Sequence, residues 1–263
     1  EAAMNFADDA VTRNPQNSDA ALFKGDLLRA QGRTAEALTL YEKVISLQPD
    51  AVAAYINRAT ILIGDKKFET AQADLKTALK LSPGSLAVSY AQALLDFSQN
   101  KHEAAREMLP QILSAAPGHM PSVLLMGATQ FALGSYAQAH QQVETYLKSI
   151  PNNLYAIKLM ASIQLKNNQA KQAVVTLTPA LNAAQQDPQL LALAGEAYMR
   201  AGDFTKATEY FEKADALIPN NAELHTAMAM SKLAQGDSKS AIADLEMATQ
   251  LDSESGRAGV MLA

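Results

Sequence analysis

Prolines recur through this sequence at a constant interval, the one that separates Pro15 from Pro49. Six prolines follow this interval: Pro15, Pro49, Pro83, Pro117, Pro151 and Pro219. Neighbours in this series are one interval apart, except the last two, which are two intervals apart. At the mark between the last two, Gln185, a proline follows three residues later, at position 188. A fixed period of roughly 34 residues is typical of a repeat protein, in which each unit packs mainly against its neighbours.

Other residue types keep the same register, counted from each proline mark. Ten residues on, every residue is small: Gly25, Ala59, Ala93, Gly127, Ala161, Gly195, Ala229 and Ala263. Twenty-two on, every residue is alanine: Ala37, Ala71, Ala105, Ala139, Ala173, Ala207 and Ala241. Twenty-six on, every residue is large and apolar: Tyr41, Leu75, Leu109, Val143, Leu177, Phe211 and Leu245. These last two positions are four apart, so they share one helical face.

The residues halfway between successive proline marks predict a turn at that position. It holds Gly32, Lys66, Asn100, Gly134, Asn168, Gly202 and Gly236. Six of these seven are Gly or Asn, which tolerate the left-handed backbone that ends many helices. Each unit is therefore expected to contain two helices joined at this turn, with the proline closing the second helix. Because one helix pair cannot cover its own apolar face, stacked pairs are expected to form an all-α solenoid.

The period also sets the predicted boundaries of one solenoid over residues 1–263. Residues 1–17 are expected to be the second helix of a truncated repeat, and residues 256–263 the start of a further one. Seven full repeats lie between them: 18–51, 52–85, 86–119, 120–153, 154–187, 188–221 and 222–255. The chain opens at Glu1, and neither end carries a polar capping helix. We therefore expect it to be a piece of a longer protein, with any targeting segment or lipid anchor outside it.

With small residues, Gly, Ala, an aromatic and Pro in these slots, the unit resembles the tetratricopeptide repeat. The resemblance covers essentially the whole chain and implies a right-handed superhelical α-solenoid of antiparallel helix pairs. One slot departs from the family pattern, which has a bulky apolar residue just before the small position of the first helix. The first three repeats carry Lys24, Arg58 and Gln92 there. We expect these repeats to pack more loosely, with the charged ends turned toward solvent.

Two segments of the sequence resemble a narrower protein family. The segments 124-LLMGATQFALGSYAQA-139 and 186-QDPQLLALAGEAYMRAGDFTKATEYFEKA-214 look like the repeat lipoprotein of bacterial exosortase (PEP-CTERM) protein-sorting systems. This resemblance implies an exported, lipid-anchored array that works beside exopolysaccharide machinery. The implied location is the periplasm or outer membrane of a Gram-negative bacterium, reached through flanking sequence. A cytoplasmic location is the alternative, because a chain without cysteine suits either compartment.

Composition excludes several classes of partner and site. The formal net charge is −5, from 22 basic and 27 acidic residues, which argues against a nucleic-acid partner. No apolar run reaches the length of about 18 residues that a membrane span requires. The sequence has no P-loop, dinucleotide-binding or nucleophile-elbow motif, and its four histidines fall at four different positions of the repeat. We therefore predict no catalytic residue, cofactor or metal, and the protein is not expected to be an enzyme.

The first helices of such an array line a concave groove, where a partner is expected to bind. Apolar candidates in this groove are Ile56, Ile63, Tyr90, Leu94, Phe97, Leu124 and Phe131. Further along come Lys158, Leu165, Lys166, Met199 and Arg200. An apolar stripe of this size suggests a trough for a helix or extended segment. The alternative is that several of these side chains pack between helices and only Tyr90, Phe97 and Phe131 reach the groove.

The three cations suggest a carboxylate site at one end of the trough. Lys166 and Arg200 occupy equivalent places on adjacent first helices, and Lys158 is expected nearby. The alternative is that Glu196, one turn before Arg200, already neutralises it.

The function predicted from the sequence is a protein-interaction scaffold that binds a peptide or helix of a protein partner of unknown identity. Two alternatives stay open. The array could be an accessory region of a larger enzyme, such as a glycosyltransferase or peptidase. It could also be a structural array that self-associates through its ends or its apolar trough.

Overall fold

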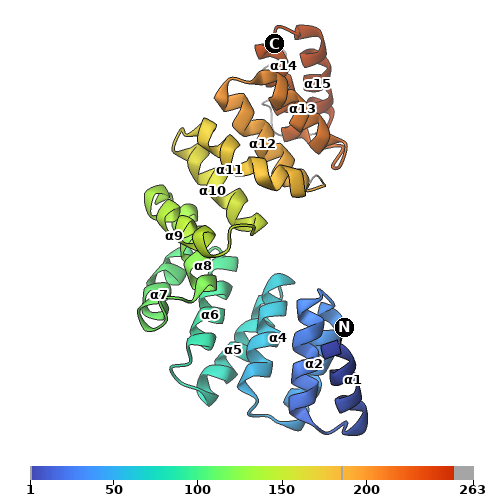
Figure 1. Cartoon of the computed structure of the whole chain (residues 1–263), viewed down its shortest axis with the longest axis vertical. Coiled ribbons are helices and arrows are strands. Elements are labelled where there is room, and N and C mark those ends of the chain that lie inside the picture. Colours follow the sequence, from blue (N-terminus) through green and yellow to red (C-terminus); the bar gives the residue numbers. More distant parts are fainter. Residues whose placement is uncertain (1, 185, 252–263) are drawn as a thin grey trace. The chain divides into compact units, whose positions relative to one another are not determined.

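The computed structural model describes residues 2–184 and 186–251, and within them the chain forms fifteen α-helices and no strand (Figure 1). The all-α class predicted from the sequence is confirmed. The first eight helices are α1 Ala2–Arg13, α2 Ser18–Ala30, α3 Thr34–Leu47, α4 Val52–Gly64, α5 Phe68–Leu81, α6 Leu86–Ser98, α7 His102–Ala115 and α8 Met120–Ala132. The others are α9 Tyr136–Ser149, α10 Leu154–Lys166, α11 Ala170–Ala183, α12 Pro188–Ala201, α13 Phe204–Asp215, α14 Ala222–Ala234 and α15 Ser238–Leu251.

The helices repeat with the period of the sequence. From Ser18 to Ala222, the even-numbered helices α2 to α14 begin at a constant interval, which equals the proline period. From Thr34 to Ser238, the odd-numbered helices α3 to α15 do the same. The predicted beginning of a further repeat at 256–263 lies outside the described residues.

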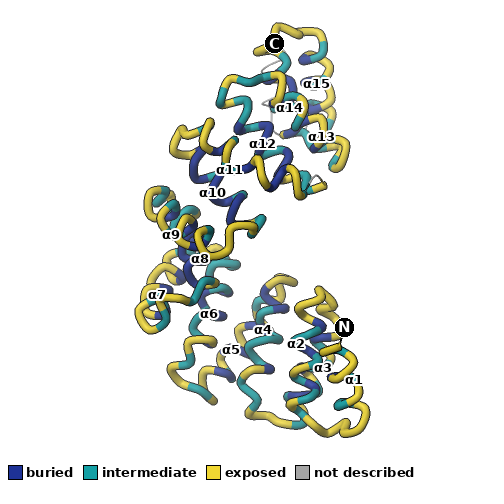
Figure 2. Tube along the Cα trace, in the orientation of Figure 1, coloured by how far each residue is buried: buried dark blue, intermediate teal, exposed yellow. Residues whose placement is uncertain are grey.

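The chain divides into two compact units, residues 1–133 and 134–263. In the first unit each helix from α1 to α8 packs against the next, and the even helices α4, α6 and α8 also contact one another in succession. In the second unit α9 to α15 pack in the same way, with α10, α12 and α14 in contact. Buried backbone alternates with exposed turns along both units (Figure 2). Each unit is therefore a stack of helix pairs, in which a core lies between successive helices.

The small and alanine positions explain how closely the two helices of a pair approach. All seven alanines of the second helices, from Ala37 to Ala241, are fully buried. A Cβ atom added to Gly195 would lie 2.5 Å from Cδ1 of Phe211, and one added to Gly25 would lie 2.8 Å from Cε1 of Tyr41. The aromatic ring of the second helix thus rests directly on the backbone of the first.

The turns within the pairs adopt the left-handed conformation that the sequence predicts. All seven residues at this mark have positive φ, including Gly202 at 86°, Asn168 at 59° and Lys66 at 59°. Asparagine tolerates this backbone because its side chain is short and polar, whereas an unbranched long side chain is strained there. Lys66 is the one member of this series that is neither Gly nor Asn.

One of the polar residues at this slot in the first three repeats, Arg58, does not turn outward as expected. The Arg58 guanidinium does not turn to solvent but donates two hydrogen bonds, of 2.8 and 2.6 Å, to the Asp74 carboxylate on α5. The Asp74 side chain is only 5% exposed, so this pair lies between the helices. Lys24 reaches Asp8 of α1 at 2.8 Å, and Gln92 bonds Gln72. The expectation of outward-turned charges is therefore wrong for Arg58, because a buried carboxylate on the partner helix needs its charge.

Candidate partner-binding surface

The apolar stripe predicted for the first unit divides into core and surface residues. Ile63 is 5% exposed and packs with Ala59, Leu75 and Leu95 in the core between α4, α5 and α6. Its side chain leaves little surface for a partner. The remaining predicted residues of this unit are half-buried: Ile56, Tyr90, Leu94, Phe97, Leu124 and Phe131.

Several of these half-buried side chains have one side against the core. Ile56 and Leu94 pack on the cluster that contains Ile63. Tyr90 and Phe97 pack on the next cluster, around Leu109 and Ile112 of α7. The Tyr90 ring meets His119 edge-on at 5.1 Å between ring centroids, and Phe97 contacts His102 at 5.2 Å. These residues therefore support the fold while leaving part of their apolar surface open to solvent.

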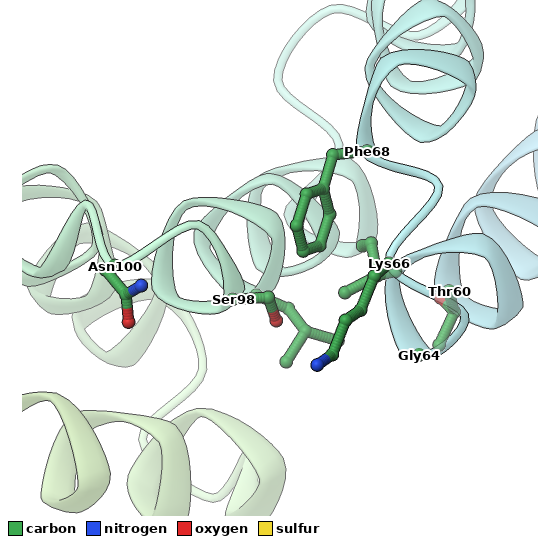
Figure 3. A pocket seen from close by; sticks show the side chains of 8 residues that line it. Thr60, Gly64, Lys66, Phe68, Ser98 and Asn100 are labelled. Carbon is green, nitrogen blue, oxygen red and sulfur yellow. The ribbon is translucent and has the colours of Figure 1, made fainter. Parts of the chain in front are cut away.

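An open pocket of about 590 Å³ lies at the turn end of α4 and α6 (Figure 3). Two neighbouring repeats supply its walls. The lining residues are Thr60, Ile63, Gly64, Lys66, Phe68, Leu94, Ser98 and Asn100. The volume falls within the range of about 300–1,000 Å³ that is usual for ligand sites.

The pocket combines an apolar floor with a polar rim. Ile63, Phe68 and Leu94 belong to or pack on the core beneath it. The hydroxyl of Thr60 already donates to the Ile56 carbonyl at 2.9 Å, so it offers only acceptor capacity. Among the described residues that line the pocket, Lys66 is the one charged side chain, and no carboxylate is present.

The cations predicted in the second unit are mostly neutralised within the chain. Lys158 donates to the Asp187 carboxylate at 2.8 Å. Burial opposes ionisation of Asp187, but the hydrogen bonds from Lys158 and from the Leu190 N–H outweigh it and lower the pKa of this carboxyl. The same carboxylate caps the N-terminus of α12. Lys158 therefore has a structural partner that sequence reasoning did not identify.

Arg200 is also paired. Its guanidinium lies 2.8 Å from Glu196, so the alternative that Glu196 neutralises it is confirmed. A second nitrogen of Arg200 donates to the Leu165 carbonyl at 3.3 Å, next to the exposed Lys166. Leu165 itself is 3% exposed and belongs to the core, and Met199 is half-buried against the same core. Of the five residues predicted here, Lys166 has the most accessible charge.

Sequence reasoning missed most of the pocket's lining, including Lys66, Phe68, Ser98 and Asn100. Two of them, Lys66 and Asn100, stand at the turn mark, which the sequence analysis treated as purely structural. The signal that could have identified the site is Lys66, the single long side chain in a series of Gly and Asn.

No metal or membrane site emerges from the part of the chain that the structure describes. No group of three or more His, Asp, Glu or Cys side chains in residues 2–184 and 186–251 could hold a metal ion. His225 lies between two carboxylates, 3.4 Å from Asp215 and 3.6 Å from Asp244. Among these same residues, no helix combines the length and apolarity needed to cross a bilayer.

Stacked helix pairs with a buried small–aromatic contact and a left-handed turn define an α-helical repeat protein. Family models agree, matching "TPR repeat" over residues 25–63 and "Tetratricopeptide repeat" over residues 62–128, 96–163, 130–197 and 198–263. The chain therefore belongs to the tetratricopeptide repeat family. No match was found among curated proteins.

Solved structures show the same fold at low sequence identity. PilF of Pseudomonas aeruginosa is 16% identical with a TM-score of 0.69, over 81% of this chain and 97% of that protein. The Cut9 and Hcn1 assembly of the APC/C matches at 16% identity and a TM-score of 0.69, over 97% of this chain and 51% of that one. MamA of Desulfovibrio magneticus RS-1 is 22% identical with a TM-score of 0.61, over 65% of this chain and 96% of that one.

Proposed function

We propose that this protein is a non-enzymatic scaffold that holds a segment of a partner protein on the first-helix face of residues 52–133. The observation that carries the proposal is the pocket on α4 and α6, together with the half-buried Leu94 and Phe97 beside it. The tetratricopeptide repeat fold is generally a scaffold for protein–protein interaction, and the chain's membership of that family supports the same conclusion.

The energetics suit a peptide ligand. Burial of apolar surface contributes about 25 cal/mol per Å². A segment that covers about 300 Å² of apolar surface would thus gain about 7 kcal/mol. Association costs at least about 4 kcal/mol in lost freedom, so additional polar contacts are needed for useful affinity. A preformed pocket reduces this cost because its walls are already ordered by the core.

For location and process we propose the bacterial envelope, in the periplasm or at the outer membrane, with a role in protein sorting or exopolysaccharide assembly. The support is the resemblance of residues 124–139 and 186–214 to the lipoprotein of exosortase systems. A lipid anchor would lie outside the present sequence. Fractionation of the source cells, with an antibody against this chain, tests the location; recovery in the cytosol would contradict it.

Replacement of Phe97 or Phe131 by Glu tests the scaffold. Affinity capture from the source cells should recover a partner with the wild-type chain and lose it with either variant. The matched control is Leu79→Glu, at a 51% exposed position of the second helix α5. It should leave capture unchanged.

Two results would contradict the scaffold. A collapse of the melting temperature in both Phe variants would place the rings in the core and remove the proposed surface. Light scattering that shows mass growing with concentration, without any partner, would favour self-association instead.

A further inference from the structure

Lys66 adopts a backbone conformation that its side chain does not favour. Its φ is 59°, in the left-handed region, where the equivalent residue of every other described turn is Gly or Asn. Strained non-glycine residues of this kind persist where the surrounding structure holds them, and they concentrate at ligand sites. An observed outlier at the edge of a pocket is therefore a reason to look for a ligand contact.

The Lys66 side chain reaches the pocket rather than a neighbouring carboxylate. Figure 3 shows Lys66 and Phe68 extending toward the space beside Ser98. The ammonium makes no ion pair with the described residues, whereas the adjacent Lys67 lies 3.7 Å from Asp65. The Ser98 hydroxyl and the Asn100 amide likewise make no side-chain hydrogen bond with the described part of the chain.

The equivalent repeat positions in the second unit carry an ion pair that the first unit lacks. Three repeats later, the positions of Leu94 and Ser98 hold Glu196 and Arg200, which form an ion pair. There, a cation and a carboxylate of the chain neutralise each other over the surface. In the first unit these two positions are uncharged; the nearby cation is Lys66 of the turn, and no carboxylate of the described lining accompanies it.

We propose that this pocket is a specificity subsite for an acidic amphipathic segment of a partner protein, an inference that rests on the function proposed above. A large apolar side chain of the segment packs on Phe68 and Leu94. A neighbouring Asp or Glu of the segment pairs with the Lys66 ammonium. Ser98 and Asn100 are placed to hydrogen-bond the main chain of the segment, which would otherwise lose its hydrogen bonds to water.

Selection from a displayed library of random heptapeptides tests this subsite. The full chain is compared with Lys66→Glu, Lys66→Gly and the matched control Lys76→Glu, an exposed lysine of α5 outside the pocket. Wild type and the control should enrich peptides with an acidic residue beside a large apolar one. Lys66→Glu should instead enrich basic residues at that place, and Lys66→Gly should show no charge preference. A synthetic copy of the best wild-type peptide should bind Lys66→Glu at least tenfold more weakly.

The outcomes separate the subsite from the scaffold. If peptides are enriched without an acidic preference, or with the same acidic preference on Lys66→Glu and Lys66→Gly, the subsite is overturned while the scaffold stands. If no variant and no wild-type sample enriches any peptide, both proposals fail. Lys66→Gly relieves the backbone strain, so the test remains decisive even if Lys66→Glu folds poorly.

Discussion

The pocket on α4 and α6 and the equivalent repeat positions on α10 and α12 carry different chemistry. In the first unit Leu94 and Ser98 border an open, apolar-floored space beside Lys66, which forms no ion pair within the described residues. In the second unit the same two positions hold Glu196 and Arg200, which form an ion pair at 2.8 Å. The helices beneath are alike, because their small, alanine and large apolar positions are the same.

This difference teaches that the repeat separates folding from recognition. The residues that hold a pair together follow the period and are buried, and those at the large position stay apolar although their size ranges from Val143 to Phe211. The inner positions contact only a part of the core, and the chain can exchange apolar for charged residues there at small energetic cost. Two charge pairs also differ in burial: the Asp74 carboxylate that pairs with Arg58 is more buried than the Asp187 carboxylate that pairs with Lys158.

The largest expected effect comes from breaking these two charge pairs. Arg58→Met should lower the free energy of unfolding by about 3 kcal/mol, because it leaves the buried Asp74 carboxylate without its charge partner. Lys158→Met should cost only about 1 kcal/mol, since Asp187 is more exposed and keeps the Leu190 N–H. Urea unfolding measures both. Equal losses would contradict the prediction that the more buried pair costs more to break.

The second effect comes from transplanting one surface onto the other. The double variant Leu94→Glu, Ser98→Arg should cover the first pocket with an ion pair like that of Glu196 and Arg200. Peptide affinity should fall at least tenfold, about 1.4 kcal/mol, and some stability should also be lost because Leu94 packs on the core. Isothermal titration with the peptide selected on wild type checks the first value. If binding were undiminished, the peptide would not bind in this pocket, and the proposed recognition surface would be wrong.

A smaller effect compares the two turns. Lys66→Gly should raise the free energy of unfolding by about 0.5–1 kcal/mol, because glycine adopts the left-handed backbone without strain. Asn168→Gly, at the equivalent turn of the second unit, should gain less, since Asn already tolerates this conformation. Thermal unfolding of the two variants provides the comparison. A gain at Lys66 accompanied by lost peptide preference would show strain retained for function.

The smallest effect concerns pH. The pKa of Asp187 is lowered in the folded chain, so this carboxylate stabilises the fold fully above its unfolded pKa of about 3.9. That contribution should disappear as the pH falls below about 4 and through the folded pKa. In Asp187→Asn this part of the pH dependence should be absent. Urea midpoints measured between about pH 6 and about pH 2.5 test it, and parallel curves would contradict the assignment.

Sequence reasoning predicted the turns and the sequence-local helix pairs well, because these depend on contacts between near neighbours. It predicted less well how deeply each side chain is buried. The helical phase placed Ile63 and Leu165 on the inner side of their helices, yet both lie in the core. The period indicates which side of a helix faces the groove, but only the residues of α5, α6, α11 and α12 decide how far that side is covered.

The sequence by itself determined the repeat, the helix pairs and the class of fold. A strict period of small, large and turn residues buries its apolar surface when the helix pairs stack. Only the tertiary structure decided where that surface opens. The pocket, the Arg58–Asp74 pair and the position of the Lys66 ammonium each depend on residues from different helices. Burial and charge pairing arise between elements, and a pattern along one chain does not encode the distances between them.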